Sequence, residues 1–417
     1  MPFFVDAENG DFRLQPASKA RNKGDKAKAA AVLGLEGLEG MTDFYGLDRV
    51  LEGEVDIGCA EFMVDPDQPT CVIAIDKEAV VAGDDVTLTA VVDGFGEAQD
   101  IVYAWQIQRA GAEAQSKSGA SVLLEDLEFG SYTVNLTASS ASLGKSAEAL
   151  EFAFLVLPKT LYVTSKENPT AASPYGTPET AAMSLQAALA VAVEGATIVL
   201  DEGTHNVSET VVVAKGISVV GSGRDKTTLY ATAAFDPVVR INGAGAQVSG
   251  LTIAHGRMNN WWTQSAVGVT IGTDGGTLAD CRVTDCEAGD ALRVFGAVSL
   301  SGSGARVTRC LIDGNTIVTS QSACGGIYAT AGVIDSCVIT NNVGAKSTSF
   351  GTHQGAGLDL AGAVSALNCT IMGNRMKDGD EGAGVHVENS SAVVRNCIID
   401  GNLSGDGTES DYLGNGA

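Results

Sequence analysis

The chain has 417 residues, enough for two or three domains, and 45% of them are hydrophobic, so a large core is available. Its formal net charge of −25 argues against nucleic acid and anionic membrane surfaces as partners, and its simplest effect is to keep the protein dispersed in water. No segment offers eighteen uninterrupted apolar residues, so no membrane span is predicted.

Residues 1–66 have the pattern of a domain's end. Phe3–Ser18 and Asp43–Phe62 resemble the closing segment that follows the last coils of bacterial surface β-helix proteins, grouped as choice-of-anchor domains. Lys19–Lys28 departs from that pattern because basic residues replace an apolar and acidic run, and it is interpreted as a solvated loop. The resemblance implies that a β-helix lies before this segment in a longer protein.

Residues 67–158 alternate between apolar and polar side chains in short runs separated by turns. Six or seven strands in so short a stretch predict an immunoglobulin-like β-sandwich. Ala82–Leu88, Tyr103-x-Trp105 and Gly130–Leu136 resemble the PKD-like branch of that fold, although the sequence after Trp105 departs from its usual acidic loop. Trp105 is therefore interpreted as a core residue, and the domain as a spacer or adhesion module.

Residues 159–417 begin with the signals of a helix at about 178–194. Thr177 suits the N-cap, a proline follows at the first helical position, and Gly195 ends the apolar face. Such a helix would close the open end of the repeats that follow, whose core would otherwise meet water. The β-rich runs between residues 196 and 221 are then the first repeats.

Five cysteines recur with a period of about thirty residues, which indicates a solenoid. Two positions after each cysteine comes Val or Ile, and this alternation points both side chains inward from a strand. Five positions after four of the cysteines comes Asn, which tolerates left-handed geometry in a turn and can bond the Asn of the next coil. These three columns are Cys281, Cys310, Cys337, Cys369 and Cys397; Val283, Ile312, Ile339, Ile371 and Ile399; and Asn315, Asn342, Asn374 and Asn402.

The cysteine column is predicted to be a stack of small buried hydrophobic residues without disulfides. Parallel side chains one strand spacing apart do not converge as a disulfide requires, and no Cys-x-x-Cys or clustered His completes a zinc site. Cys59 and Cys71 flank a domain junction. Whether they form a disulfide is left open, because the sequence does not place their Cα atoms.

A shorter strand is predicted before each cysteine unit, and each coil is expected to hydrogen-bond to the next. These strands are 268–271, 291–294, 326–329, 357–360 and 384–387. The ladder resembles the right-handed, pectin-lyase-like parallel β-helix superfamily over residues 159–417. The resemblance implies an all-β chain, in which this β-helix follows the sandwich and the closing segment.

The short strands supply the candidate site. In each short strand, the residue that follows the first apolar residue must face outward. These residues form one column on a solvent-facing sheet: Thr270, Arg293, Tyr328, Asp359 and His386. Arg293 could hold a sugar carboxylate, Tyr328 could stack or donate, and Asp359 could orient His386 for proton transfer. These four are the ligand-binding and catalytic candidates. The alternative is that outward positions on a β-helix are simply polar.

The long loops all follow the Asn turn, so they should stack on one side of the solenoid and border the column of outward-facing residues. Trp261 and Trp262 in the first loop could stack on a sugar ring or could cover the solenoid. Lyases of the superfamily often hold Ca²⁺ between rungs, but Asp313 and Asp400 lie three rungs apart, roughly 14 Å. The acidic run Asp378–Glu381 is interpreted as a solvated turn. No cofactor is therefore expected, with Ca²⁺ as the alternative.

Two functions follow. The first is a non-enzymatic extracellular or cell-surface protein of bacterial type, for structural display, adhesion or glycan binding. The alternative is a polysaccharide lyase or glycosidase that acts on an acidic polysaccharide. The spacer, the closing segment and the missing catalytic motifs of polygalacturonases favour the first. The chain also stops where another strand is due, so residues 2–14 are expected to dock on the coil near 393–417 of another copy, head to tail.

Overall fold

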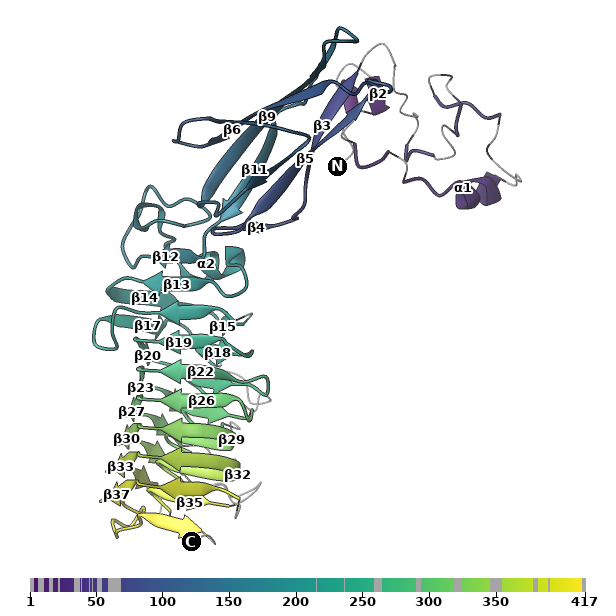
Figure 1. Cartoon of the computed structure of the whole chain (residues 1–417). Helices are drawn as coiled ribbons and strands as arrows, with labels where there is room; N and C mark the ends of the chain where they lie inside the picture. The colour runs from purple at the N-terminus through teal and green to yellow at the C-terminus, as the bar shows by residue number, and fades with distance from the viewer. Residues whose placement is uncertain are drawn as a thin grey trace. The chain divides into compact units, whose positions relative to one another are not determined.

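The chain forms two compact units, Met1–Leu157 and Pro158–Ala417, in which strands dominate (Figure 1). None of the described helices is long and apolar enough to cross a membrane. The computed structural model describes residues 4–6, 11–14, 18–21, 23–33, 38, 40–44, 46, 48–50, 55–58, 69–214, 216–235, 237–258, 265–289, 294–318, 324–345, 355–377, 382–388 and 391–414.

The segment before the sandwich contains a strand pair and one helix. β1 (Phe4–Asp6) and β2 (Asp11–Leu14) pair with each other in antiparallel fashion, so both halves of the segment predicted to dock on another copy have a partner in their own chain. Part of the basic stretch predicted as a loop is instead α1 (Lys26–Leu33). The helix begins there because the Asp25 carboxylate accepts the backbone N–H of Lys28 at 2.9 Å, as an N-cap does.

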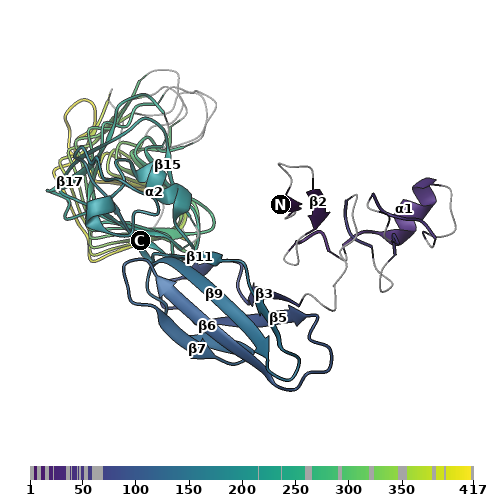
Figure 2. The same ribbon diagram turned by 90° about the horizontal axis from the view of Figure 1, so that it is seen from above.

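The first unit contains the predicted β-sandwich, built from two antiparallel sheets around one hydrophobic core. Figure 2 shows strands of both sheets lying side by side. The larger sheet has the order β4 (Val80–Val81), β11 (Phe152–Leu157), β9 (Gly130–Ser140), β6 (Ile101–Arg109) and β7 (Gln115–Ser118), with β10 (Lys145–Glu148) on β9. The smaller sheet is β3 (Thr70–Ile75), β5 (Val86–Asp93) and β8 (Ser121–Leu124).

Trp105 is the central core residue of the sandwich, as predicted. It is fully buried, and its indole N–H donates to the Gly119 carbonyl at 2.8 Å. The Tyr132 hydroxyl donates to the Glu128 carbonyl at 3.1 Å, four residues upstream, which is the corner contact of immunoglobulin-like sandwiches. The assignment to the PKD-like branch stays a prediction. Cys71 is a buried free thiol, whereas Cys59, its suggested partner, lies outside the described residues.

The second unit is the predicted parallel β-helix, in which every strand pairs with its equivalent in the next coil. The strands that follow the cysteines form one continuous face. This cysteine face consists of β14 (Gly203–Val207), β17 (Thr227–Ala231), β20 (Thr252–Ala254), β23 (Arg282–Thr284), β27 (Leu311–Asp313), β30 (Val338–Thr340), β33 (Thr370–Met372) and β37 (Ile398–Asp400).

The strands just before the cysteines form the second face, and the short strands form the third; two long strands bend to serve both. The second face contains β12 (Thr160–Val163), β13 (Thr197–Leu200), β16 (Ser218–Val220), β19 (Gln247–Ser249), β22 (Gly276–Ala279), β26 (Ala305–Thr308), the ends of β29 (Ile327–Asp335) and β32 (Leu358–Leu367), and β36 (Val393–Arg395). The short-strand face contains β15 (Val211–Val213), β18 (Val239–Ile241), β21 (Val269–Ile271), β25 (Val298–Leu300), the starts of β29 and β32, β35 (Val385–Val387) and β38 (Tyr412–Gly414).

A fourth, small sheet directly after the Asn turn was not predicted. It consists of β24 (Glu287–Ala288), β28 (Thr316–Ile317), β31 (Val343–Gly344) and β34 (Arg375–Met376). The first residues of the long loops are therefore ordered strands that repeat from rung to rung, and only the later parts differ between rungs.

The predicted capping helix is shorter than 178–194 and is split. η2 (Pro178–Thr180) is a 3-10 turn with Thr177 as its N-cap, and α2 (Leu185–Val191) begins after a second N-cap, Ser184. Leu185 and Ala188 are buried in the β-helix core. Seen from above, α2 lies across the stacked coils, so the end of the solenoid is covered as expected (Figure 2).

Each cysteine lies at a corner rather than inside a strand, which corrects the sequence interpretation. The residue before it has left-handed backbone: Asp280, Arg309, Ser336, Asn368 and Asn396 have φ of 54–55°. This residue separates the second face from the cysteine face. The ladder asparagines themselves are not left-handed; the residue before each of them is, with φ of 56–66° at Gly314, Asn341, Gly373 and Gly401.

The cysteine column is buried and unpaired, as predicted. Cys281, Cys310, Cys337 and Cys369 are at most 1% exposed, and Cys397 is partly exposed. Each thiol lies within 3.5–3.8 Å of a carbonyl of the preceding rung. A thiol is small enough for the corner and is also a weak donor, which an alanine or valine would not be.

These thiols should be inert in the folded protein. Burial raises the pKa of Cys281 to about 12, so little thiolate forms near neutral pH. We expect a disulfide reagent at pH 8 to leave the four buried column thiols, those of Cys281, Cys310, Cys337 and Cys369, unmodified in the native protein and to count at least five column thiols after denaturation without reductant. A disulfide between any two column cysteines would contradict the structure.

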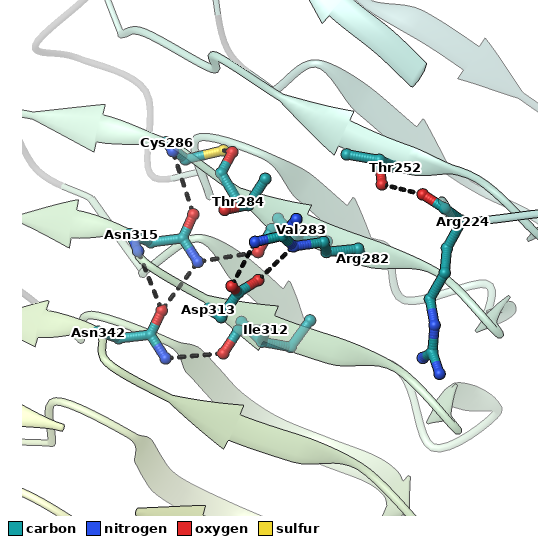
Figure 3. A network of polar contacts seen from close by, with 10 residues as sticks. All are labelled: Arg224, Thr252, Arg282, Val283, Thr284, Cys286, Ile312, Asp313, Asn315 and Asn342. Carbon is teal, nitrogen blue, oxygen red and sulfur yellow. Dashed lines mark hydrogen bonds and ion pairs between the residues drawn. The ribbon is translucent and has the colours of Figure 1, made fainter. Parts of the chain in front are cut away.

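The Asn ladder is confirmed and continues beyond the asparagines at both ends. In Figure 3, the Asn315 amide donates to Asn342 Oδ1 at 2.8 Å, and its own oxygen accepts the backbone N–H of Cys286 at 3.1 Å. Asn374 and Asn402 repeat the contact, and the Asn402 amide donates to Asp411 Oδ1 at 2.7 Å. Every ladder amide is fully buried, so each bond replaces one that water can no longer provide.

Removing one ladder amide should therefore be costly. Asn342→Ala leaves the Asn315 amide and the Ile312 carbonyl without their contacts to this side chain, and we expect a loss of about 2–4 kcal/mol in the free energy of unfolding. Asn206→Ala, at an exposed position on the same solenoid, should change it by less than about 0.5 kcal/mol. Urea denaturation followed by circular dichroism compares the two.

Candidate functional site

The short-strand face carries a polar column, but its register differs from the prediction. Thr270 pairs with Ser299, Ser299 with Tyr328, Tyr328 with Asp359, and Asp359 with His386. We call these five residues the short-strand column. Arg293 has no place in it, because the strand of that rung is Val298–Leu300 and not 291–294.

The wrong strand was chosen because the other short strands follow a glycine directly. In this rung Ala297 takes the place of that glycine, before the alternating Val298-Ser-Leu. The run 291–294 has similar alternation, yet residues 290–293, Arg293 included, lie outside the described part of the chain. The same is true of Trp261 and Trp262, so their predicted contact with a sugar stays a prediction.

The column is largely buried, whereas the sequence predicted that it faces solvent. Tyr328 is 9% exposed, His386 6% and Asp359 0%. Residues that precede the strands fold back over them: the Phe295 ring stacks on Tyr328 with centroids 4.7 Å apart, and the Ser265 hydroxyl lies 3.0 Å from that of Thr270. Loop residues thus add an outer layer that alternation within the strands does not reveal.

Asp359 and His386 form the closest polar pair of the column. His386 Nδ1 lies 2.9 Å from Asp359 Oδ1, and both side chains are buried. Their strands are adjacent and in register, so the two side chains leave the sheet side by side. This is the arrangement in which a carboxylate orients an imidazole. The predicted pairing of Asp359 with His386 is therefore present, but the pair is buried and not exposed as predicted.

Three further residues surround this pair, and the sequence indicated only one of them. Glu388 has a carboxylate oxygen within 4.8 Å of the ligand atoms of Asp359 and His386. Burial, followed by the charges of Asp359 and Glu388, raises the pKa of Tyr328 well above its ordinary value. Burial and the Asp359 charge do the same for the thiol of Cys324. The site is thus a largely buried cluster of side chains that includes two carboxylates, rather than an open groove.

The first coil contains a second pair of the same kind. His205 Nε2 lies 3.2 Å from Asp201 Oδ1, and His205 is buried. Burial disfavours the charged form of Asp201, but hydrogen bonds from Thr164 and Ser165 outweigh it and lower its pKa. A buried histidine paired with a partly exposed carboxylate can therefore be a structural element of this solenoid.

The acidic residues considered for Ca²⁺ are not brought together. Asp313 and Asp400 belong to one column three rungs apart, as predicted. Asp313 accepts two hydrogen bonds from the Arg282 guanidinium, at 2.8 and 2.6 Å (Figure 3). Asp378–Glu381 lie outside the described residues. Asp313 and Asp400 therefore do not share one ion-binding site.

Comparison with known proteins agrees with the architecture. Residues 237–412 match the family described as "Right handed beta helix region", so this part of the chain is a right-handed β-helix. No curated protein sequence matches the chain significantly. Among solved structures, the family 28 exopolygalacturonase of Yersinia enterocolitica is similar with 10% identity and a TM-score of 0.18, over 84% of this chain and 99% of that chain. At that score the likeness says nothing about activity.

The buried pair makes a prediction about stability. His386→Ala removes one hydrogen-bond partner of the fully buried Asp359, and we expect a loss of about 2 kcal/mol in the free energy of unfolding. Arg240 lies on the same face two rungs before Ser299 and is exposed, so Arg240→Ala should cost less than about 0.5 kcal/mol. Equal effects of the two substitutions in urea denaturation would contradict a buried pair.

Proposed function

We propose that this chain is a non-enzymatic β-helix scaffold of the cell surface or extracellular space that binds a glycan. The observation that carries the proposal is the burial of Asp359 and His386. A catalytic base must come within hydrogen-bond reach of the proton that it abstracts. A polysaccharide is a large substrate, and an imidazole that is 6% exposed beside a fully buried carboxylate is poorly placed to meet it.

The remaining architecture supports the same function. The polar bonds of each rung are made within the solenoid by the Asn ladder and the cysteine corners, so the outer surface is left for recognition. The β-sandwich in the same chain suits a spacer or adhesion module. For the glycan contact we propose Trp261 and Trp262, because adjacent tryptophans offer flat apolar surfaces to sugar rings.

A polysaccharide lyase or glycosidase is the second candidate. It is favoured by the 2.9 Å contact between His386 Nδ1 and Asp359 Oδ1, since an imidazole oriented by a carboxylate is a common proton-transfer unit. In this case the layer over the column has to open for the substrate, and His386 becomes essential.

Glycan binding and turnover separate the two candidates. We expect a glycan array to show binding, and titration with the bound glycan to show a loss of about tenfold or more in Trp261→Ala/Trp262→Ala, because ring stacking is lost. His386→Ala should bind as the wild type does. No uronate-type product absorbance should develop on a panel of acidic polysaccharides. If the wild type forms product and His386→Ala does not, the scaffold proposal is wrong and the chain is an enzyme.

A further inference from the structure

Two rungs of the short-strand face bring one imidazole and two carboxylates to one place. His386 and Glu388 are two residues apart in extended backbone, so both side chains leave the same side of the strand. The Glu388 N–H donates to the Leu360 carbonyl at 3.1 Å, which continues the pairing past the end of β35. Asp359 is the cross-strand partner of His386. Strand register alone therefore assembles the three side chains.

The distances between these groups suit a shared cation. One ligand atom from each of the three residues lies within 4.8 Å of the other two. The contact of 2.9 Å between His386 Nδ1 and Asp359 Oδ1 has a further meaning. Two neighbouring ligands of an octahedral ion, with bonds of about 2.1 Å, are roughly 3 Å apart. An ion could thus replace the shared proton with little movement of either side chain.

We propose that Asp359, His386 and Glu388 form a binding site for a divalent first-row transition-metal ion of the Zn²⁺ or Mn²⁺ kind. Carboxylate oxygens and an imidazole nitrogen are ligand types that such ions take in proteins. Asp359 and His386 are buried and Glu388 is partly buried, so protein surrounds the ion on most sides. The site belongs to the solenoid itself and does not depend on glycan binding.

The ligand set selects the type of metal. Ca²⁺ and Mg²⁺ prefer six or more oxygen ligands, whereas an imidazole combined with carboxylates suits Zn²⁺, Mn²⁺ and related ions. The other group of close acidic side chains in the described residues, Asp400, Glu409 and Asp411, offers only oxygens, and two of the three are exposed. That group is expected to give weak binding at most.

The bound ion would cross-link two successive rungs. Asp359 belongs to β32, whereas His386 and Glu388 belong to the next coil. A cation that both coils ligate adds its binding free energy to the contact between them, because no such site exists in the unfolded chain. The proposed role of the metal is therefore structural: it would join two coils that the Asn ladder also joins, through Asn374 and Asn402.

The test uses the full chain, stripped with a chelator and titrated calorimetrically with Zn²⁺, Mn²⁺ and Ca²⁺. We expect one site for Zn²⁺ or Mn²⁺ that is at least tenfold tighter than any Ca²⁺ binding, together with a rise in the unfolding temperature. His386→Gln and Glu388→Gln should each weaken that site by at least about tenfold. Glutamine keeps the size of both side chains approximately, so the fold is checked by circular dichroism.

His205→Gln is the matched control, because His205 is also buried and paired with an aspartate but has no third ligand in the described residues. It should retain the tight site, as should Glu409→Gln, which alters the all-oxygen group. The proposal is overturned if the wild type takes up no Zn²⁺ or Mn²⁺, if Ca²⁺ binds equally well, or if the His386 and Glu388 variants bind like the controls.

Discussion

Register between neighbouring coils is the constraint on which the second unit depends. A parallel rung leaves a row of N–H and C=O groups that only the next rung can pair, so equivalent positions must fall at equal places in every coil. The corners fix those places. A left-handed residue before each cysteine turns the chain, the thiol contacts a carbonyl of the preceding rung, and the Asn five positions later bonds along the stack. Coil length then varies most between the Asn turn and the short strand, and by one or two residues between the short strand and the next cysteine.

The same constraint explains where chemically unusual groups collect. Inward positions need apolar side chains, and the corners are filled mostly by cysteine and asparagine, with Leu251 in the cysteine position of one coil, so these positions vary little. The outward positions of the short-strand face can vary, and they lie beside the variable loops. Residues from those loops cover Thr270 and Tyr328, which converts an outward column into an enclosed one. Polar groups enclosed in this way must satisfy one another, as Asp359 and His386 do.

The sequence could predict the positions that the repeat fixes, but not those that depend on the variable loops. The period of the cysteines, the alternation to Ile312 and the spacing to Asn315 are local patterns, and they predicted the fold and the ladder correctly. The choice of Arg293 over Ser299 failed because Ala297 stands where other rungs have glycine, so the start of the strand is not marked. The prediction that the column faces solvent failed for another reason. Burial of the column depends on loop residues that fold back over it, and the periodicity of the strands carries no information about those loops. The pairing of Asp359 with His386 was predictable, because it needs only register.

The two histidine–carboxylate pairs show that geometry alone does not define a role. Asp201 and His205 lie in one coil, four residues apart, and hydrogen bonds from neighbouring hydroxyl groups stabilise the carboxylate. Asp359 and His386 come from different coils and have a second carboxylate beside them. Asp201 is joined to the preceding coil by Thr164 and Ser165, whereas Asp359 and His386 themselves come from two coils. This difference in connectivity, more than the shared chemistry, is why only the second pair can join rungs through a common ligand.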